Sequence, residues 1–288
     1  MRNANTYIYN MKQILFCLIM LVLAIGCTTS NDQRLFSDDP VPVIPKKETT
    51  LFNGKNYDGW DLWMQANDAS KPADEVFTVQ DGAMHITGEG FGGCTTQKAY
   101  KDYHLTMEFR YVGDAYASRK GRAADGGLLF HCVGPEGVYG GIWHLSFECN
   151  IIQGRCCDLI VVGNKKDYPD ILHAKAHVDD LGRWEPDESK GKVLSLTDEG
   201  RVNSVTYDGT WQDEETQPIV RPEKPYGEWN TLELICEGST AEYILNGKTM
   251  LKLFDLNPSA GRIQLQSECH AIEYRNIKIA PIRKKGAH

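Results

Sequence analysis

Three polar residues in one segment are the strongest candidates for chemistry in this sequence. Glu148 and Asn150 lie two positions apart, so in a β-strand their side chains point to the same face. Gln153 follows five residues after Glu148 and joins that face only if a bulge intervenes. A carboxyl group and two amides side by side would suit a sugar, because its hydroxyl groups need both donors and acceptors.

The residue types in this segment also limit the reaction. The spacing is similar to the Glu-x-Asp-x-x-Glu strand of laminarinase-type glycosidases, but here the second and third acids are amides. A retaining glycosidase needs two carboxyl groups about 5–5.5 Å apart, and this segment offers one. Direct glycoside hydrolysis is therefore disfavoured, and a purely structural role for Glu148 stays open as an alternative.

The elements that must position these residues are predicted to be strands. Leu105, Met107 and Phe109 alternate with polar residues, which is the pattern of a half-buried strand. Asn246-Gly247 predicts a two-residue hairpin turn. Many short strands, with no long helical period, predict an all-β sandwich of two antiparallel sheets. Residues 179–225 are charged and interrupted by Pro, and we expect long surface loops there.

The N-terminus carries the features of an export signal. Lys12 precedes an apolar run over residues 14–25, too short for a confident transmembrane helix but typical of a secretory signal peptide. Ala24-Ile25-Gly26-Cys27 resembles a bacterial lipobox. We therefore expect lipidation of Cys27 and a lipid-anchored, periplasmic or outer-membrane protein of the bacterial cell envelope. An ordinary signal peptide with an incidental Cys is the alternative.

These features divide the chain into four parts. Residues 1–26 are predicted to be the lipoprotein signal peptide and residues 27–50, which contain three Pro, a tether. Residues 51–282 would form the folded domain, and residues 283–288 a basic tail.

Charge and cysteine content exclude some classes of protein. The net charge is −8, so we expect no nucleic-acid partner, and membrane contact only through the lipid anchor. Of nine cysteines, seven would remain after Cys17 and Cys27, and an odd number cannot all pair internally. Most lie in apolar segments, where we expect free thiols that pack as small hydrophobic groups.

An ordered set of motifs resembles the bacterial 3-keto-glucoside 1,2-lyase / 3-keto-2-hydroxyglucal hydratase family and covers nearly all of residues 51–280. In chain order the motifs are Leu51-Phe52-Asn53-Gly54-Lys55 with Gly59-Trp60, then residues 79–84, 103–110, 126–131, 148–154, 226–230, 245–248, 261–268 and 274–277. Two positions differ from the family pattern: Asn150 stands where the family has Gln, and Gln153 where it has an acid.

The resemblance implies a concanavalin-like jelly-roll sandwich that acts on 3-keto-glucosides. In such a sugar the C3 ketone makes the C2 hydrogen acidic. Its removal leads to loss of the C1 group by β-elimination, and water can add to the resulting 2-hydroxyglucal. This chemistry needs a base, a proton donor and a group that holds the enediolate charge.

The resemblance also implies roles for individual residues. Glu148 would be the acid or base, and His131, from a neighbouring strand, the second titratable group. The groups expected to hold the substrate are Asn150, Gln153 and Gln266, while Asp158 and Glu268 could complete the site or bind a cation.

Several alternatives stay open. No cofactor is certain, and a divalent cation is one option. A non-catalytic carbohydrate-binding lipoprotein and a glycoside hydrolase of the same fold are the competing functions. Trp143 is expected in the core, and Arg119 in a solvated basic loop over residues 119–122.

Overall fold

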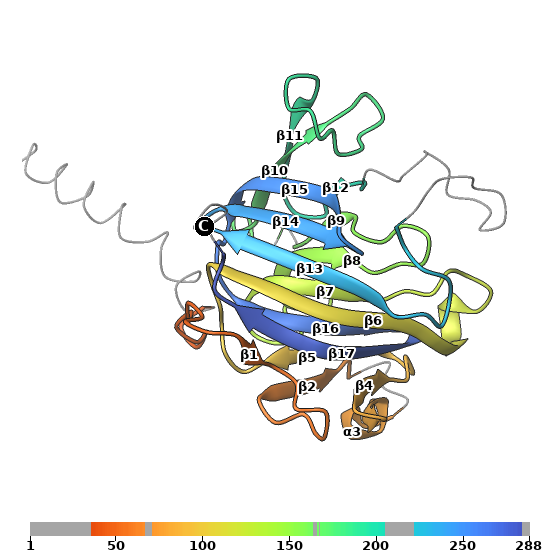
Figure 1. Ribbon diagram of the computed structural model, residues 1–288. Coiled ribbons are helices and arrows are strands. Elements are labelled where there is room, and N and C mark those ends of the chain that lie inside the picture. Colours follow the sequence, from red (N-terminus) through yellow and green to blue (C-terminus); the bar gives the residue numbers. More distant parts are fainter. Residues whose placement is uncertain (1–35, 67–70, 164–165, 167, 205–221, 284–288) are drawn as a thin grey trace, which may run out of the picture. The chain divides into compact units, whose positions relative to one another are not determined.

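The computed structural model describes residues 36–66, 71–163, 166, 168–204 and 222–283. Its named strands all belong to one compact unit, Asp39–His288. Two antiparallel sheets lie face to face in this unit (Figure 1). The prediction of an all-β, concanavalin-like jelly-roll sandwich is confirmed.

The larger sheet has ten strands. Its order is β11 (Lys192–Leu196), β10 (His173–Val178), β15 (Lys248–Asn257), β14 (Thr240–Leu245), β13 (Asn230–Glu237), β6 (Tyr103–Ala115), β17 (His270–Ala280), β4 (Ala83–Ile86) and β3 (Phe77–Gln80), with the short β1 (Thr49–Thr50) paired to β17. Leu245 pairs with Lys248, which confirms the hairpin predicted at Asn246-Gly247.

The smaller sheet has seven strands and carries the residues of greatest interest. Its order is β12 (Arg201–Val202), β9 (Leu159–Val162), β8 (Leu145–Asn150), β7 (Gly127–Val133), β16 (Arg262–Glu268), β5 (Phe91–Thr96) and β2 (Trp60–Met64). The described helical elements are one turn of α-helix, α3 (Ala73–Val76), and a short 3-10 turn, η1 (Ala117–Arg119). None of the helices in the described residues is long and apolar enough to span a membrane.

The core lies between the two sheets and follows the period of two seen in the sequence. Leu105, Met107 and Phe109 of β6 are at most 1% exposed. Across the interface, the ring of Phe130 in β7 meets Tyr243 of β14 edge-on, with 5.8 Å between centroids. The seven cysteines of the domain are buried and unbridged, so they pack as the sequence predicts.

Two predicted boundaries need correction. The folded unit begins before Leu51, because Val43 bridges Tyr100 and β1 pairs with β17. Residues 179–225 are not only loops, since β11 and β12 lie within them. The predicted signal peptide and Cys27 lie outside the described residues.

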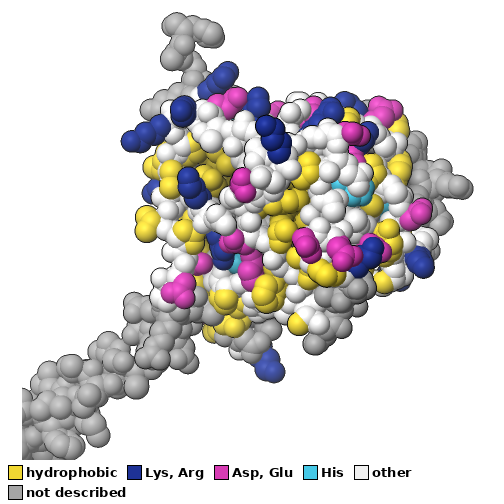
Figure 2. Space-filling model, turned by 90° about the horizontal axis from the view of Figure 1, so that it is seen from below, with side chains coloured by type: hydrophobic (Ala, Val, Ile, Leu, Met, Phe, Trp, Pro, Cys, Tyr) yellow, Lys and Arg dark blue, Asp and Glu magenta, His cyan; other side chains and the backbone are white. Residues whose placement is uncertain are grey.

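On the face shown in Figure 2, basic and acidic side chains are interspersed, and neither sign forms a continuous patch.

Candidate functional site

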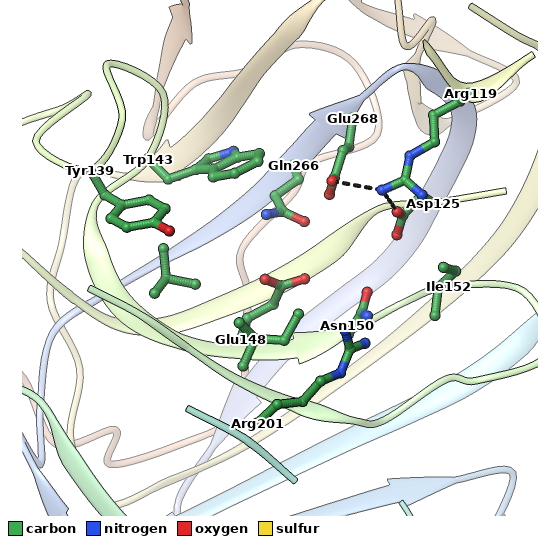
Figure 3. Close-up of a pocket in the computed structure, with 12 residues that line it drawn as sticks. Arg119, Asp125, Tyr139, Trp143, Glu148, Asn150, Ile152, Arg201, Gln266 and Glu268 are labelled. Atoms are coloured by element: carbon green, nitrogen blue, oxygen red, sulfur yellow. Dashed lines mark hydrogen bonds and ion pairs between the residues drawn. The ribbon is translucent and has the colours of Figure 1, made fainter. Parts of the chain in front are cut away.

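A pocket of about 210 Å³ lies on the face of the seven-stranded sheet that is turned away from the ten-stranded sheet (Figure 3). Strands β8, β9, β12 and β16 supply its base, and the segments before β7 and β8 supply its ends. The lining residues are Arg119, Asp125, Tyr139, Trp143, Glu148, Asn150, Ile152, Ile160, Val162, Arg201, Gln266 and Glu268. Of the seven predicted site residues, Glu148, Asn150, Gln266 and Glu268 meet here.

The alternation of β8 explains why Glu148 and Asn150 reach the pocket. Phe147 of the same strand points the other way, where its ring packs against Phe130 in the core. Next to them on β7 is Gly127, which pairs with Asn150. A Cβ atom at Gly127 would overlap the amide oxygen of Gln266 and come within 2.7 Å of Glu148 Oε1. Because glycine has no side chain, position 127 keeps open the space that the Glu148 and Gln266 side chains occupy.

Glu148 is a buried carboxyl group whose pKa is strongly shifted by its surroundings. Its residue is 5% exposed. Burial, followed by the negative charge of Glu268, raises the pKa of Glu148 well above its usual value, while Arg201 and Arg119 oppose this shift. The group is therefore a strong base when ionised and holds a proton at a pH where an exposed glutamate would have lost it.

Glu268 brings a second carboxyl group to the pocket from β16. Its pKa is also raised by burial, but the neighbouring Arg119 guanidinium favours the charged form. Arg119 Nη2 lies 3.0 Å from Glu268 Oε1 and also forms an ion pair with Asp125. Of the two glutamates, Glu268 has the directly paired charge, so the proton shared by the pair is better placed on Glu148.

Asp158 does not line the pocket but holds a residue that does. It is fully buried, and its carboxylate lies 2.8 Å from Arg155 Nη2 and 3.3 Å from Arg201 Nη2. It also accepts a hydrogen bond from the Ser204 amide at 2.7 Å. Asp158 therefore fixes the Arg201 guanidinium at the edge of the pocket.

The Gln266 amide is the group most clearly prepared for a ligand. The residue is fully buried, yet neither its Nε2 nor its Oε1 makes a hydrogen bond of good geometry within the protein, although the amide lies close enough to the Glu148 carboxyl group to lower the pKa of that group. An unpaired amide is costly in a buried place. Since Gln266 lines the pocket beside Glu148, a bound hydroxyl or carbonyl group would satisfy it.

Two predicted site residues lie elsewhere. His131 belongs to the core: it is fully buried, its ring is edge-on to Tyr103 of the other sheet, and its Nδ1 lies 3.0 Å from the Pro258 carbonyl oxygen. The irregular register of β7 between Phe130 and Val133 turns it inward. Burial lowers its pKa to about 4. Gln153 sits in the turn after β8, which ends at Asn150 without the bulge that would be needed.

Several residues that line the pocket were not predicted from the sequence. Arg119 was expected in a solvated loop, but it is paired with the buried Asp125 and with Glu268. Arg201 lies in the stretch predicted to be loops, and Trp143 lines the pocket instead of the core. No sequence motif marked Tyr139 or Asp125 as a site residue. Their place in the pocket depends on which strands become neighbours in the sheet.

No metal site is evident in the described part of the chain. No group of three or more His, Cys, Asp or Glu side chains is arranged there to hold an ion. Two acids of the pocket, Asp125 and Glu268, are instead paired with Arg119.

Comparison with solved structures shows similar sandwiches at low sequence identity. A candidate glycosyl hydrolase from Parabacteroides distasonis is 18% identical, with a TM-score of 0.46 over 83% of this chain and 95% of that chain. A carbohydrate-binding module, CBM66 from Bacillus subtilis, is 9% identical, with a TM-score of 0.39 over 83% and 99% of the two chains. The Bacillus licheniformis β-glucanase is 7% identical, with a TM-score of 0.41 over 81% and 97%.

The sequence itself gives the more specific relationship. Among curated proteins, none is detectably similar to this chain. The sequence profile of the 3-keto-alpha-glucoside-1,2-lyase-like domain, however, matches residues 47–280, which includes both sheets and every residue that lines the pocket. The chain therefore belongs to the 3-keto-alpha-glucoside-1,2-lyase-like family of carbohydrate-active proteins.

Proposed function

We propose that this protein cleaves 3-keto-glucosides by elimination across C1 and C2, and that it can hydrate the resulting 2-hydroxyglucal. The observation that carries the proposal is a pair of carboxyl groups in one pocket: Glu148, which is buried without an ion pair among the described residues, and Glu268, which is paired with Arg119. One acid and one base in the same pocket are what an elimination requires.

The protein's own groups can be assigned to each proton transfer. The Glu268 carboxylate takes the C2 proton, and the electrons of that bond form the enediolate with C3. As the C3 ketone re-forms, the C1–O1 bond breaks, C1 and C2 become doubly bonded, and Glu148 gives its proton to O1. Addition of water reverses these roles. The water oxygen bonds to C1 while Glu148 takes a proton from that water molecule, and Glu268 returns a proton to C2. The pair then stands in its starting state.

Charge and hydrogen bonding in the pocket support the enediolate. Negative charge on the substrate oxygens would lie near Arg201, whose orientation Asp158 fixes. The unpartnered Gln266 amide offers a donor to the same oxygens, and Asn150 offers another. Fixed donors of this kind stabilise developing charge without reorganisation.

A second candidate is direct glycoside hydrolysis. The segment around Glu148 offers one carboxyl group, but Glu268, which the family resemblance suggested could complete the site, lines the same pocket and supplies a second. Most glycosidases use two carboxyl groups as their catalytic residues. A non-catalytic sugar-binding protein is the third candidate, since the pocket offers amides to a sugar with or without turnover.

One comparison of substrates separates the three functions. The purified protein is incubated with a 3-keto-glucoside and with its parent glucoside, and product formation is followed together with ultraviolet absorbance of the conjugated enone. Elimination predicts that only the keto compound is consumed, through the absorbing species. Equal cleavage of the parent glucoside would identify a hydrolase. Binding of either sugar with no turnover would identify a binding protein.

We also propose that the protein is lipid-anchored in the bacterial envelope. The support is the sequence Ala24-Ile25-Gly26-Cys27. Two acyl chains would anchor a protein firmly, whereas one is marginal. Changing Cys27 to Ala should abolish labelling by fatty acid and move the protein out of the detergent phase. Unchanged labelling and partitioning in that variant would contradict the anchor.

A further inference from the structure

The two ends of the pocket differ in chemistry. Figure 3 shows Tyr139 and Trp143 at one end, Arg119, Asp125 and Glu268 at the other, and Glu148 with Gln266 between them. The sheet register agrees with this order. Glu148 pairs with Ile160, whereas Val162 lies two residues further toward the aromatic end, opposite Ser146.

The aromatic end has its polar atoms already engaged. The Trp143 indole N–H donates to the Gly92 carbonyl oxygen at 3.3 Å, and the Tyr139 hydroxyl donates to Glu199 Oε1 at 3.4 Å. The lining residue of β9 at this end is Val162, whose side chain is aliphatic. This end therefore offers ring faces and methyl groups, and few donors or acceptors to a ligand.

A sugar ring fits the opposite end better. A 3-keto-glucose unit carries oxygens at nearly every carbon, and each needs a partner when it leaves water. The charged groups and the unpaired Gln266 amide lie at the centre and at the arginine end. Placing the sugar there puts O1 near Glu148 and directs whatever is attached to O1 toward Tyr139 and Trp143.

The aromatic wall is also held in place. The Tyr139 amide donates to the Trp143 carbonyl oxygen at 2.8 Å, so both rings come from one short turn. At the base of this turn, Glu136 Oε1 lies 2.9 Å from Nε2 of the buried His144. Glu136 Oε2 accepts a hydrogen bond from Gln264 Nε2 at 3.1 Å. A fixed wall loses little entropy when a flat group packs against it.

We propose that the end of the pocket formed by Tyr139, Trp143 and Val162 receives the leaving group, and that the preferred substrates carry an apolar, ring-bearing aglycone. A hydroxyl-rich second sugar would leave its oxygens without partners at this end. The inference rests on the proposed elimination, because it places O1 beside Glu148.

The test uses benzyl and methyl 3-keto-glucosides, which both release a simple alcohol of similar basicity. Their rates therefore differ mainly through contacts of the ring. For the wild-type protein we expect kcat/KM to be roughly tenfold higher for the benzyl compound. Tyr139→Ala should bring the two values close together by lowering only the benzyl rate. Tyr139→Phe is the matched control, because it keeps the ring and loses only the contact with Glu199.

Each outcome is decisive for the subsite. Equal rates for both compounds in the wild-type protein would overturn it. An equal loss of kcat/KM for both compounds in Tyr139→Ala would also overturn it, since Tyr139 would then contact the sugar and not the leaving group. If neither compound reacts, the proposed elimination fails, and calorimetric binding of the same two compounds replaces the rates. A benzyl preference in binding that Tyr139→Ala removes would still support the subsite, and its absence would reject it.

Discussion

Glu148 and Glu273 are two buried glutamates in strands of opposite sheets, and their surroundings differ. Their exposures are 5% and 6%. Glu273 on β17 lies 2.7 Å from Arg110 Nε and 3.0 Å from His85 Nδ1. Glu148 on β8 has no comparable ion pair among the described residues, and it faces the charge of Glu268. Burial alone therefore does not identify a reactive carboxyl group, because the partners decide whether its charge is settled.

The same contrast extends to the surroundings of each residue. Near Glu273, Trp229 lies between two guanidinium groups, with Arg110 at 4.6 Å and Arg275 at 3.9 Å from the ring. Arg275 is itself paired with Glu108 at 2.6 Å. Those charges are therefore paired with one another. Around Glu148 the arginines line a cavity, and the neighbouring Gln266 amide is unpaired.

The largest expected effect comes from replacing the two glutamates in turn. Glu148→Gln keeps the shape but removes the transferable proton, so turnover should fall by about 10²–10⁴-fold without loss of stability. Glu273→Gln should leave the rate per folded molecule unchanged and lower stability by about 1–3 kcal/mol, because Arg110 and His85 lose their partner. Single-turnover rates and melting temperatures measure both. Near-normal turnover in a folded Glu148→Gln protein would remove Glu148 from the mechanism.

The next effect sharpens the role of space around Glu148. Gly127→Ala would push the Glu148 and Gln266 side chains away from their positions, because the new Cβ overlaps them. Both displaced groups are flexible side-chain ends, so the fold should survive. A misplacement of this size costs about 10²-fold in rate. The corresponding control is Gly182→Ala, in a turn where no atom lies within 4 Å of a new Cβ. Because φ at Gly182 is +73°, this variant should lose some stability but keep the wild-type rate per folded molecule. Unaltered kinetics in Gly127→Ala would show that the carboxyl position is not critical.

The third prediction concerns His131 and works through stability. Its pKa of about 4 in the folded protein lies below the ordinary value of 6.5. The unfolded chain therefore binds a proton first as the pH falls, and stability should decrease between about pH 6.5 and pH 4, by about 2 kcal/mol at pH 5. His131→Asn should remove this acid sensitivity and leave turnover within about threefold of normal. A large loss of rate in a well-folded variant would return His131 to the mechanism.

The smallest effect distinguishes the stability contributions of the two glutamates. Because the folded protein raises the pKa of Glu148, ionisation of this group opposes folding, and stability is lost as the pH rises through the folded-state pKa. Glu148→Gln should then melt higher than the wild type at pH 8, by a few degrees, with little difference at pH 4. Glu273→Gln should not gain stability at pH 8. A lower melting temperature for Glu148→Gln than for the wild type at pH 8 would show that the Glu148 carboxylate has a stabilising partner in the wild-type protein.

Much of the architecture followed from local patterns. The alternation in β6 and the Asn246-Gly247 turn predicted the strands and one hairpin, since both depend on neighbours along the chain. The same alternation placed Glu148 and Asn150 on one face and Phe147 on the other. These features are set by the two-residue period of a strand, which needs no knowledge of its partners.

The composition of the pocket required the tertiary structure. Glu268 and Arg119 are separated by 149 residues yet form an ion pair, and Arg201 reaches the pocket from a stretch that resembles a loop. His131 and Gln153 show the reverse: adjacent motifs suggested a shared site, but an irregular strand turned one inward and β8 ended before the other.

The sequence by itself determined a family, an all-β sandwich and the face on which Glu148 lies. Only the tertiary structure decided that Glu268, rather than His131, is its partner, that Arg119 and Arg201 neutralise the site, and that its two ends differ. The physical reason is that strand order brings distant residues together, and the pKa of a buried group depends on all the charges and the solvent around it. Neither the strand order nor the burial is encoded in the spacing of a motif.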